Sequence, residues 1–431
     1  MGVDRESGSE PGRRGPSAGR ALTRRRFLAA AGLAAGSVAA PIPRWIRAAV
    51  ASLPARIGPE DLDGLRAAIE RYMEAQHIPG LAAAVVQGDR MEWAEGFGLA
   101  NIAQNRVPTP ETVFLLASIS KTVTGAAVMQ LVERGQCDLD ADVNGYLPFP
   151  VRNPIAPDAP ITARMLLTHT SSINDDPELL SRLYFHGDSP IELGDFMEAY
   201  LVPGGQYYSE ESYLPFGPGE HWRYCNYAVA LAGYLVEAIG GIPFDRHCSH
   251  EIFQPLGMTQ TSWHLAGLHR RSLAMPYAYD WDTGGFDPYG HYGYPDYPDG
   301  LLRTSASQLA TFLMAFIGDG ELYGTRILEP ATVQEMRRIQ FPELAPWQGL
   351  IWFYETDNTG HVLLGHNGGD LGVATVMFYR PEDGVGVIVL TNGESYPQRI
   401  QDRIFAWATK QAPPTRVGST AWRTRRQLRQ S

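Results

Sequence analysis

The sequence predicts an α+β protein, with one antiparallel sheet built from both ends of the folded body, flanking helices and an inserted, mainly helical lobe at about residues 140–300. Strand-like apolar runs occur near residues 81–99 and return near residues 351–390, whereas most of the chain between them has helical periodicity. The 431 residues, 44% of them hydrophobic, are enough for a sizeable core in one large or two ordinary domains.

The first elements of the folded body form a helix and a hairpin. Apolar residues recur at helical spacing from Leu62 to Met73, and Pro79 ends that helix. Residues 81–87 and 91–99 are two apolar runs joined by a turn at Gly88, which predicts an antiparallel pair of strands.

The helices and strands after residue 160 are predicted from the same spacing of apolar residues. We expect helices at residues 161–170, 229–239, 302–316 and 398–409, and strands at residues 351–355, 373–379 and 386–390. Asp383-Gly384 provides the turn between the last two strands. His169, at the end of the first of these helices, is expected to be structural, because a histidine there usually bonds nearby backbone.

Charge and cysteine content exclude several classes of protein. The net charge is -11, and the positive charge gathers at the two ends, so the body between them is strongly acidic. An acidic body argues against nucleic acid as a partner. Three cysteines, Cys137, Cys225 and Cys248, are too few for a disulfide framework or a zinc cage, although one bridge is possible. We expect neither a metal nor a cofactor.

The two ends of the chain have a composition of their own. Residues 1–22 are rich in Gly, Ser, Pro and Arg, and Arg24-Arg25-Arg26 then precede a mild apolar run at residues 29–40. This order is typical of a twin-arginine export signal, and the run is too short for a stable membrane anchor. We therefore expect a disordered leader and export signal over 1–51, a folded domain over 52–411, a basic disordered tail over 412–431, and a periplasmic or extracellular location. The alternative is a basic leader before an alanine-rich helix.

The first candidate catalytic residues are Ser118 and Lys121, which follow the apolar run Phe114–Ala117 at the start of a predicted helix. A three-residue spacing puts both side chains on one helix face. A serine hydroxyl needs a base to become a nucleophile, and an uncharged lysine amine can serve. The chain has 36 Lys plus Arg but only two lysines, Lys121 and Lys410, so a chance Ser-x-x-Lys is improbable.

A second candidate pair is Tyr224 and Asn226, which precede a long apolar helix. Two residues apart in a loop, their side chains can point to the same side. A phenol beside a lysine ammonium is shifted toward phenolate, so Tyr224 could relay the serine proton to a leaving group. Asn226 could bond either the lysine or the substrate carbonyl.

A third candidate segment, His366-Asn367-Gly368-Gly369, ends an apolar strand. Glycines on a strand allow a ligand or another backbone to approach closely. A peptide N–H there could help to hold an oxyanion. The alternative is a turn with a surface histidine.

Ser-x-x-Lys, Tyr-x-Asn and His-x-Gly in this order resemble the serine β-lactamase-related family, which includes class C β-lactamases, D-Ala-D-Ala carboxypeptidases, D-aminopeptidases and related esterases. The likeness covers about residues 58–410, and further segments are similar to family segments: Ile78–Leu81, Leu166–Ser171, Phe216–Gly219, Pro255–Met258 and Gly300–Ser305. The resemblance implies the β-lactamase/transpeptidase-like fold, which agrees with the α+β arrangement predicted above.

The resemblance also implies roles for the candidate residues. Ser118 is cast as the nucleophile that forms an acyl-enzyme, Lys121 as its base and Tyr224 as the proton shuttle beside Asn226. The backbone N–H groups of Ser118 and Gly369 would form the oxyanion hole. Neither metal nor cofactor is implied.

One motif departs from the family pattern, because His366 stands where antibiotic-hydrolysing members have a lysine. A mostly neutral histidine holds a substrate carboxylate less firmly than a lysine does. We therefore favour a serine hydrolase with small ester or amide substrates. Two alternatives stay open: a D-Ala-D-Ala carboxypeptidase, D-aminopeptidase or weak β-lactamase with peptide substrates, and a catalytically silent binding protein on the same fold.

Overall fold

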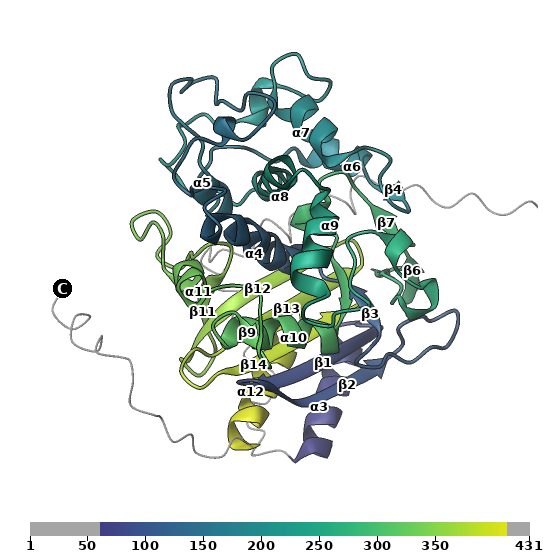
Figure 1. Ribbon diagram of the computed structural model, residues 1–431. Coiled ribbons are helices and arrows are strands. Elements are labelled where there is room, and N and C mark those ends of the chain that lie inside the picture. Colours follow the sequence, from purple (N-terminus) through teal and green to yellow (C-terminus); the bar gives the residue numbers. More distant parts are fainter. Residues whose placement is uncertain (1–60, 412–431) are drawn as a thin grey trace, which may run out of the picture.

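The computed structural model describes residues 61–411 (Figure 1). Its centre is a six-stranded antiparallel sheet in the order β11-β12-β13-β14-β1-β2. The strands are β1 (Gly80–Gln87), β2 (Arg90–Gly98), β11 (Phe353–Thr356), β12 (Val362–Asp370), β13 (Val373–Tyr379) and β14 (Val385–Thr391). The predicted sheet from both ends of the folded body is confirmed. The expected export signal over 1–51, the first residues of the expected domain (52–60) and the whole expected tail over 412–431 lie outside the described residues.

The pairing of β1 with β14 joins the two ends of the folded body. Leu81 lies opposite Thr391 and Val85 opposite Val387, in an unbroken antiparallel register. The central strands β1, β13 and β14 are buried on both faces, which explains why they appear in the sequence as continuous apolar runs and not as alternating ones.

Two helices cover one face of the sheet, α3 (Leu62–Ala75) and α12 (Gln398–Gln411), and Figure 1 shows them side by side. Each presents an apolar stripe at helical spacing, with Leu65 and Ile69 on α3 and Ile400 and Ile404 on α12. These stripes pack on alternate strand residues such as Val85. The two ends of the described chain therefore close one core together.

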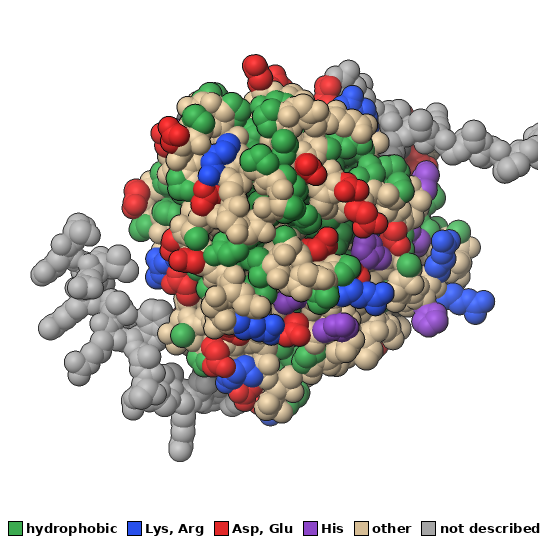
Figure 2. All heavy atoms as spheres, turned by 45° about the horizontal axis from the view of Figure 1, so that its top comes forward, with side chains coloured by type: hydrophobic (Ala, Val, Ile, Leu, Met, Phe, Trp, Pro, Cys, Tyr) green, Lys and Arg blue, Asp and Glu red, His purple; other side chains and the backbone are tan. Residues whose placement is uncertain are grey.

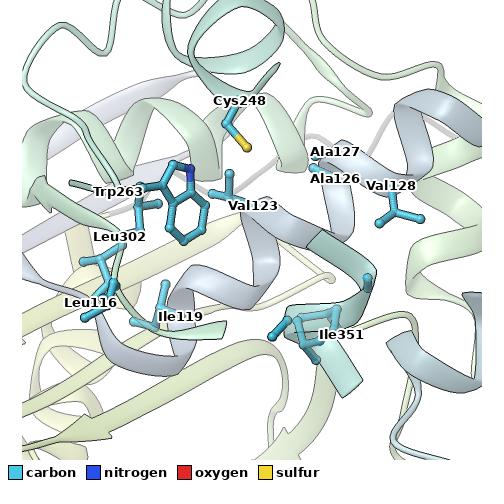
Figure 3. Close-up of a cluster of buried hydrophobic side chains, with 14 of the residues drawn as sticks. Leu116, Ile119, Val123, Ala126, Ala127, Val128, Cys248, Trp263, Leu302 and Ile351 are labelled. Carbon is cyan, nitrogen blue, oxygen red and sulfur yellow. The ribbon is translucent and has the colours of Figure 1, made fainter. Parts of the chain in front are cut away.

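The opposite face carries α10 (Ala306–Ile317), and beyond it α4 (Ser120–Glu133) and α8 (Asn226–Gly240). Every α4 residue from Ser120 to Leu131 is buried, so this helix runs through the middle of the molecule. Figure 3 shows Val123 of α4 in one buried apolar cluster with Trp263 and Leu302. A helix surrounded on all sides can hold a side chain deep inside the protein, and Lys121 is on this helix.

The inserted lobe contains α5 (Ala163–Leu167), α6 (Pro177–Arg182), α7 (Leu193–Leu201), α8 and α9 (Phe244–Cys248), joined by long loops. Figure 2 looks onto this lobe, over which acidic side chains are scattered. Short strand pairs tie the lobe and its connections to the rest of the fold, namely β3 (Val113–Leu115) with β8 (Arg303–Ser305), β4 (Phe185–His186) with β7 (Tyr292–Gly293), and β5 (Tyr277–Asp280) with β6 (Gly285–Pro288). The remaining elements are β9 (Glu321–Leu322), β10 (Thr325–Arg326) and α11 (Pro330–Arg337).

One prediction about a single position needs correction, and the open question of the cysteines is answered. The helix at residues 229–239 begins earlier, at Asn226, because Cys225 caps it; Asn226 is therefore in a helix and not in a loop. The three cysteines, Cys137, Cys225 and Cys248, are all buried free thiols.

Within residues 61–411 no single helix has the length and apolar character to cross a membrane, although the bent pair Asn226–Gly240 and Phe244–Phe253 meets those two criteria together.

Candidate active site

The predicted nucleophile occupies a tight turn ahead of α4. Strand β3 leads into the 3₁₀ turn η1 (Ala117–Ile119), and Ser118 is its middle residue. Ala117 has a φ of +50°, a left-handed conformation that is uncommon for residues with a side chain. Such backbone strain occurs often at functional sites. The turn leaves Ser118 only 8% exposed, at the wall of a cavity.

Lys121 lies one turn along, completely buried on α4. Its Nζ donates to Ser118 Oγ at 3.0 Å, to the side-chain oxygen of Asn226 at 2.8 Å and to the backbone oxygen of Asp299 at 2.6 Å. An ammonium group has three hydrogens and needs three acceptors. The environment of Lys121 therefore matches a charged lysine.

Tyr224 approaches the same serine from the loop before α8. Its hydroxyl donates to Ser118 Oγ at 2.9 Å, and Lys121 Nζ lies 5.2 Å from its ring centre. The ring packs against the imidazole of His169, with centroids 4.4 Å apart. His169 is buried and accepts a hydrogen bond from the N–H of Cys225 at 3.2 Å, which fixes the loop that carries Tyr224. The expected structural role of His169 agrees with these contacts.

Asn226 links the lysine to a carboxylate that the sequence analysis did not single out. While its side-chain oxygen accepts from Lys121, its side-chain nitrogen donates to Asp175 at 2.8 Å. Asp175 also accepts from the backbone N–H groups of Asn226 and Tyr227, both at 2.9 Å, at the start of α8. The Asn226 amide therefore bonds the lysine through its oxygen and Asp175 through its nitrogen, at the lining of the cavity.

Burial and charge set the protonation states of the pair. Burial lowers the pKa of Lys121, but its electrostatic and hydrogen-bonding interactions with Tyr224 and Asp299 outweigh burial, and the pKa is raised. Burial raises the pKa of Tyr224 more than the adjacent Lys121 lowers it. The resting pair is therefore an ammonium and a neutral phenol, whereas the sequence suggested a lysine poised to lose its proton and a phenol shifted toward phenolate.

The glycines of the third segment bring β12 against the serine turn. A Cβ on Gly368 would lie 2.4 Å from the backbone oxygen of Leu116 and 2.9 Å from the backbone nitrogen of Ser118, so only glycine fits there. The neighbouring Gly369 lines the same cavity as Ser118. This close approach is the arrangement that the expected oxyanion hole needs.

His366 and Asn367 are placed differently from the expectation that they contact substrate. His366 is buried, bonds the backbone oxygen of Asn367 through Nδ1 at 2.5 Å, and does not line the cavity. Burial, aided by the charge of Lys121, lowers the pKa of His366 to about 3, so it is neutral. The Asn367 side chain bonds Tyr396, on the face of α3 and α12, because side chains alternate along a strand.

The cavity beside Ser118 has a volume of about 280 Å³. Its walls come from α6 and the loops of the lobe, from the end of β12 with the residue that follows it, and from the Tyr224 loop. Tyr224 and Tyr294 contribute aromatic rings to the lining. Asp175, Asp299 and Asp370 also line it, and no motif in the sequence pointed to them. Within residues 61–411 no group of His, Cys, Asp and Glu side chains has the geometry of a metal site.

This fold, with a serine, a lysine and a tyrosine converging at one cavity, is the β-lactamase/transpeptidase fold of serine hydrolases. The chain belongs to the Beta-lactamase family, whose family model matches residues 65–411. The predicted resemblance is therefore confirmed. Family members include esterases, amidases and β-lactamases.

Among curated proteins the chain is similar to the protein flp of Staphylococcus aureus (strain N315), with 22% identity over 324 residues. That match covers 75% of this chain but only 61% of the relative, so the chain spans less than two thirds of its length.

Solved structures show the same fold. A penicillin-binding protein homologue from Pyrococcus abyssi matches with a TM-score of 0.66 and 24% identity, covering 81% of this chain and 78% of that one. The D-amino acid amidase from Ochrobactrum anthropi gives 0.64 and 20%, covering 82% and 100%. The class C β-lactamase from Rhodobacter sphaeroides gives 0.59 and 22%, covering 80% and 98%.

Proposed function

We propose that this protein hydrolyses small esters or amides through an acyl-enzyme on Ser118. The observation that carries the proposal is the pair of hydrogen bonds that Ser118 Oγ accepts, from Lys121 Nζ at 3.0 Å and from Tyr224 at 2.9 Å, at the wall of a cavity. A nucleophile held between two proton-carrying groups, on rigid elements and open to a ligand, is the arrangement that acyl transfer requires.

The proposed reaction has two steps. The Lys121–Tyr224 pair first loses one proton to solvent. Ser118 Oγ then attacks the substrate carbonyl and gives its proton to the pair, which passes it to the departing alcohol or amine. The backbone N–H groups of Ser118 and Gly369 stabilise the oxyanion. In the second step water attacks the acyl-enzyme, its proton passes to the same pair, and Ser118 recovers a proton as the acid leaves.

We favour ester or amide substrates over β-lactams and D-Ala-D-Ala peptides because of the segment His366–Gly369. Those two substrates carry a carboxylate, and a buried neutral His366 outside the cavity cannot pair with it. Among residues 61–411, Arg223 is the one cationic residue that lines the cavity, and it is exposed. Carboxylate binding by Arg223 is the specific alternative, and it would favour a peptidase or weak β-lactamase.

The experiment compares p-nitrophenyl butyrate with nitrocefin, using wild type and Ser118→Ala, with fluorophosphonate labelling of both proteins. We expect ester turnover and labelling in wild type, loss of both in Ser118→Ala, and little nitrocefin hydrolysis. Nitrocefin turnover comparable to that of the ester would establish the alternative with Arg223. A protein that neither turns over the ester nor takes the label would favour a silent binding protein.

We also propose export through the twin-arginine route, which rests on the sequence of residues 23–40 alone. Arg24→Lys combined with Arg25→Lys should leave the precursor in the cytoplasm, as judged by fractionation and immunoblotting. Unaltered export of that double variant would contradict the proposal.

A further inference from the structure

Gly369, whose backbone N–H is expected in the oxyanion hole, is not held by packing on its own open side. A Cβ on Gly369 would meet nothing within 4 Å, so no other part of the described chain packs there. Catalytic groups must nevertheless be held within about 0.5 Å of their productive geometry. The position of Gly369 therefore depends on the residues next to it, at the end of β12.

The turn that follows Gly369 does not fix this end of the strand by itself. A two-residue loop, Leu371-Gly372, joins β12 to β13, because Asp370 pairs with Val373. Of the two loop residues only Gly372 has a positive φ, of +70°. Hairpin loops of two residues that match the strand twist have a positive φ at the first residue or at both. This loop matches the twist poorly, so contacts from outside the hairpin must hold it.

Those contacts come from three tyrosine hydroxyls of the inserted lobe. Tyr184 donates to Asp370 Oδ1 at 2.7 Å, and Tyr294 donates to Asp370 Oδ2 at 3.2 Å. Tyr292 donates to the backbone oxygen of Leu371 at 2.8 Å. The Asp370 carboxylate also accepts from the N–H of Leu371 at 2.7 Å, which ties the side chain to the loop. We refer to the three tyrosines together with Asp370 as the tyrosine clamp.

The tyrosines of the clamp support one another. The ring centroid of Tyr184 lies 5.2 Å from that of Tyr292 and 5.2 Å from that of Tyr294. The two segments that carry these rings are paired as β4 and β7 (Figure 1). Tyr292 and Tyr294 are both buried. Hydroxyl groups bond a carboxylate more strongly than a neutral acceptor, so Asp370 is a firm point of attachment for the end of β12.

We propose that the tyrosine clamp positions the backbone N–H of Gly369 for oxyanion binding, which makes Tyr184, Tyr292 and Tyr294 positioning residues of the reaction. They act through the strand, because Asp370 directly follows Gly369 in the chain. Tyr292 is the clearest case, since its hydroxyl bonds the loop although the residue does not line the cavity. This inference rests on the proposed hydrolase function and deepens it.

Kinetics with p-nitrophenyl butyrate test the clamp in variants that lose a hydroxyl and keep the ring. We expect Tyr292→Phe to lower kcat about tenfold and to change KM less than about twofold, because stabilisation is lost only in the transition state. The Ki of butylboronic acid, a mimic of the tetrahedral intermediate, should rise by a similar factor. Tyr184→Phe/Tyr292→Phe should extend both effects. An unchanged kcat in this double variant, or a lower kcat with an unchanged Ki, would overturn the proposal.

The matched control is Tyr354→Phe. The Tyr354 hydroxyl also donates to a backbone oxygen, that of Arg337 at 2.9 Å, but Tyr354 is on β11 and does not line the cavity. This variant should keep the wild-type kcat and the wild-type Ki. A loss of kcat in Tyr354→Phe as large as that in Tyr292→Phe would assign the effect to general loosening of the fold, and would also overturn the proposal.

Hydrogen exchange separates this inference from the proposed function. Exchange is followed by mass spectrometry in peptides that cover residues 366–375. We expect it to be about tenfold faster there in Tyr184→Phe/Tyr292→Phe than in wild type, and unchanged in peptides from α3. Unaltered exchange over residues 366–375 would overturn the clamp, whether or not the protein hydrolyses the ester. A wild-type protein without ester turnover would contradict the proposed function alone, because the exchange result still decides on the clamp.

Discussion

At the residue scale, the strongest constraint on the site is steric and lies at Gly368. A Cβ at this position would be 2.4 Å from the backbone oxygen of Leu116 and 2.9 Å from the backbone nitrogen of Ser118. Gly368→Ala must therefore push β12 away from the serine turn, and we expect at least a tenfold loss of kcat/KM and about 1–3 kcal/mol of stability. Ester turnover and urea unfolding measure the two effects.

The matched control is Gly145→Ala, since a Cβ on Gly145 meets nothing within 4 Å. It should leave both turnover and stability near wild type. Full activity in Gly368→Ala would mean that the contact between β12 and the serine turn is irrelevant to the reaction.

A second prediction at this scale concerns Asp175, which positions the amide of Asn226 and adds negative charge near Lys121. Because both Lys121 and Tyr224 have raised pKa values, the resting pair must lose a proton before it can act as a base, so kcat/KM should rise with pH in the alkaline range. Asp175→Asn removes a charge that raises the pKa of Lys121. The rise of kcat/KM with pH should therefore shift to lower pH in this variant. The maximal kcat/KM should fall, because Asn226 loses the carboxylate that holds its side-chain amide in place.

The pH profile separates this positioning role from simple damage to the fold. A variant that is only less stable would lose activity at every pH and keep the wild-type midpoint. An unchanged midpoint in folded Asp175→Asn, verified by circular dichroism, would refute the electrostatic part of the argument.

At the element scale, the contact of α12 with β11 contains a partly buried acid. Burial raises the pKa of Glu355 on β11 to about 7, opposed by a hydrogen bond from Gln401 on α12. An acid with a raised pKa in the folded state stabilises the fold fully below its unfolded pKa, and this contribution is lost as pH rises toward 7. We expect Glu355→Gln to be more stable than wild type by about 1–2 kcal/mol at pH 8, and not at pH 4.

Urea unfolding at the two pH values measures this difference. The exposed Glu74 of α3 gives the control Glu74→Gln, which should behave as wild type at both. A Glu355→Gln effect of the same size at pH 4 and pH 8 would show that ionisation is not its cause.

The elements themselves were largely predictable from local pattern. The strands at residues 81–87, 91–99 and 373–379 lie within a residue or so of the observed β1, β2 and β13, because continuous apolar runs between turns define them. The positive φ of Ala117 was not predictable, since nothing in an alanine signals a left-handed turn. Asp175 and Asp299 were missed for another reason: they reach the site through contacts such as the one between Lys121 and Asp299, which are 178 residues apart in the chain.

At the scale of the whole molecule, the two ends of the folded body and the connection out of the lobe meet at Asn392. This buried residue follows β14, and its side-chain nitrogen donates to the backbone oxygens of Leu99 at 3.1 Å, Ala100 at 3.2 Å and Met275 at 3.0 Å. Leu99 and Ala100 follow β2, and Met275 leads out of the lobe. One amide thus joins three distant parts of the chain.

Because these carbonyl groups lie inside the protein, losing their donor leaves them without partners, which costs more than the hydrogen bonds alone. We expect Asn392→Ala to lower the free energy of unfolding by about 2–4 kcal/mol. Asn392→Asp keeps the shape of the side chain but removes the donor, so it should be destabilised at least as much at pH 7. Urea unfolding followed by tryptophan fluorescence measures both variants. A stable Asn392→Asp protein would mean that shape, and not the donated hydrogen bonds, holds the ends of the sheet to the lobe.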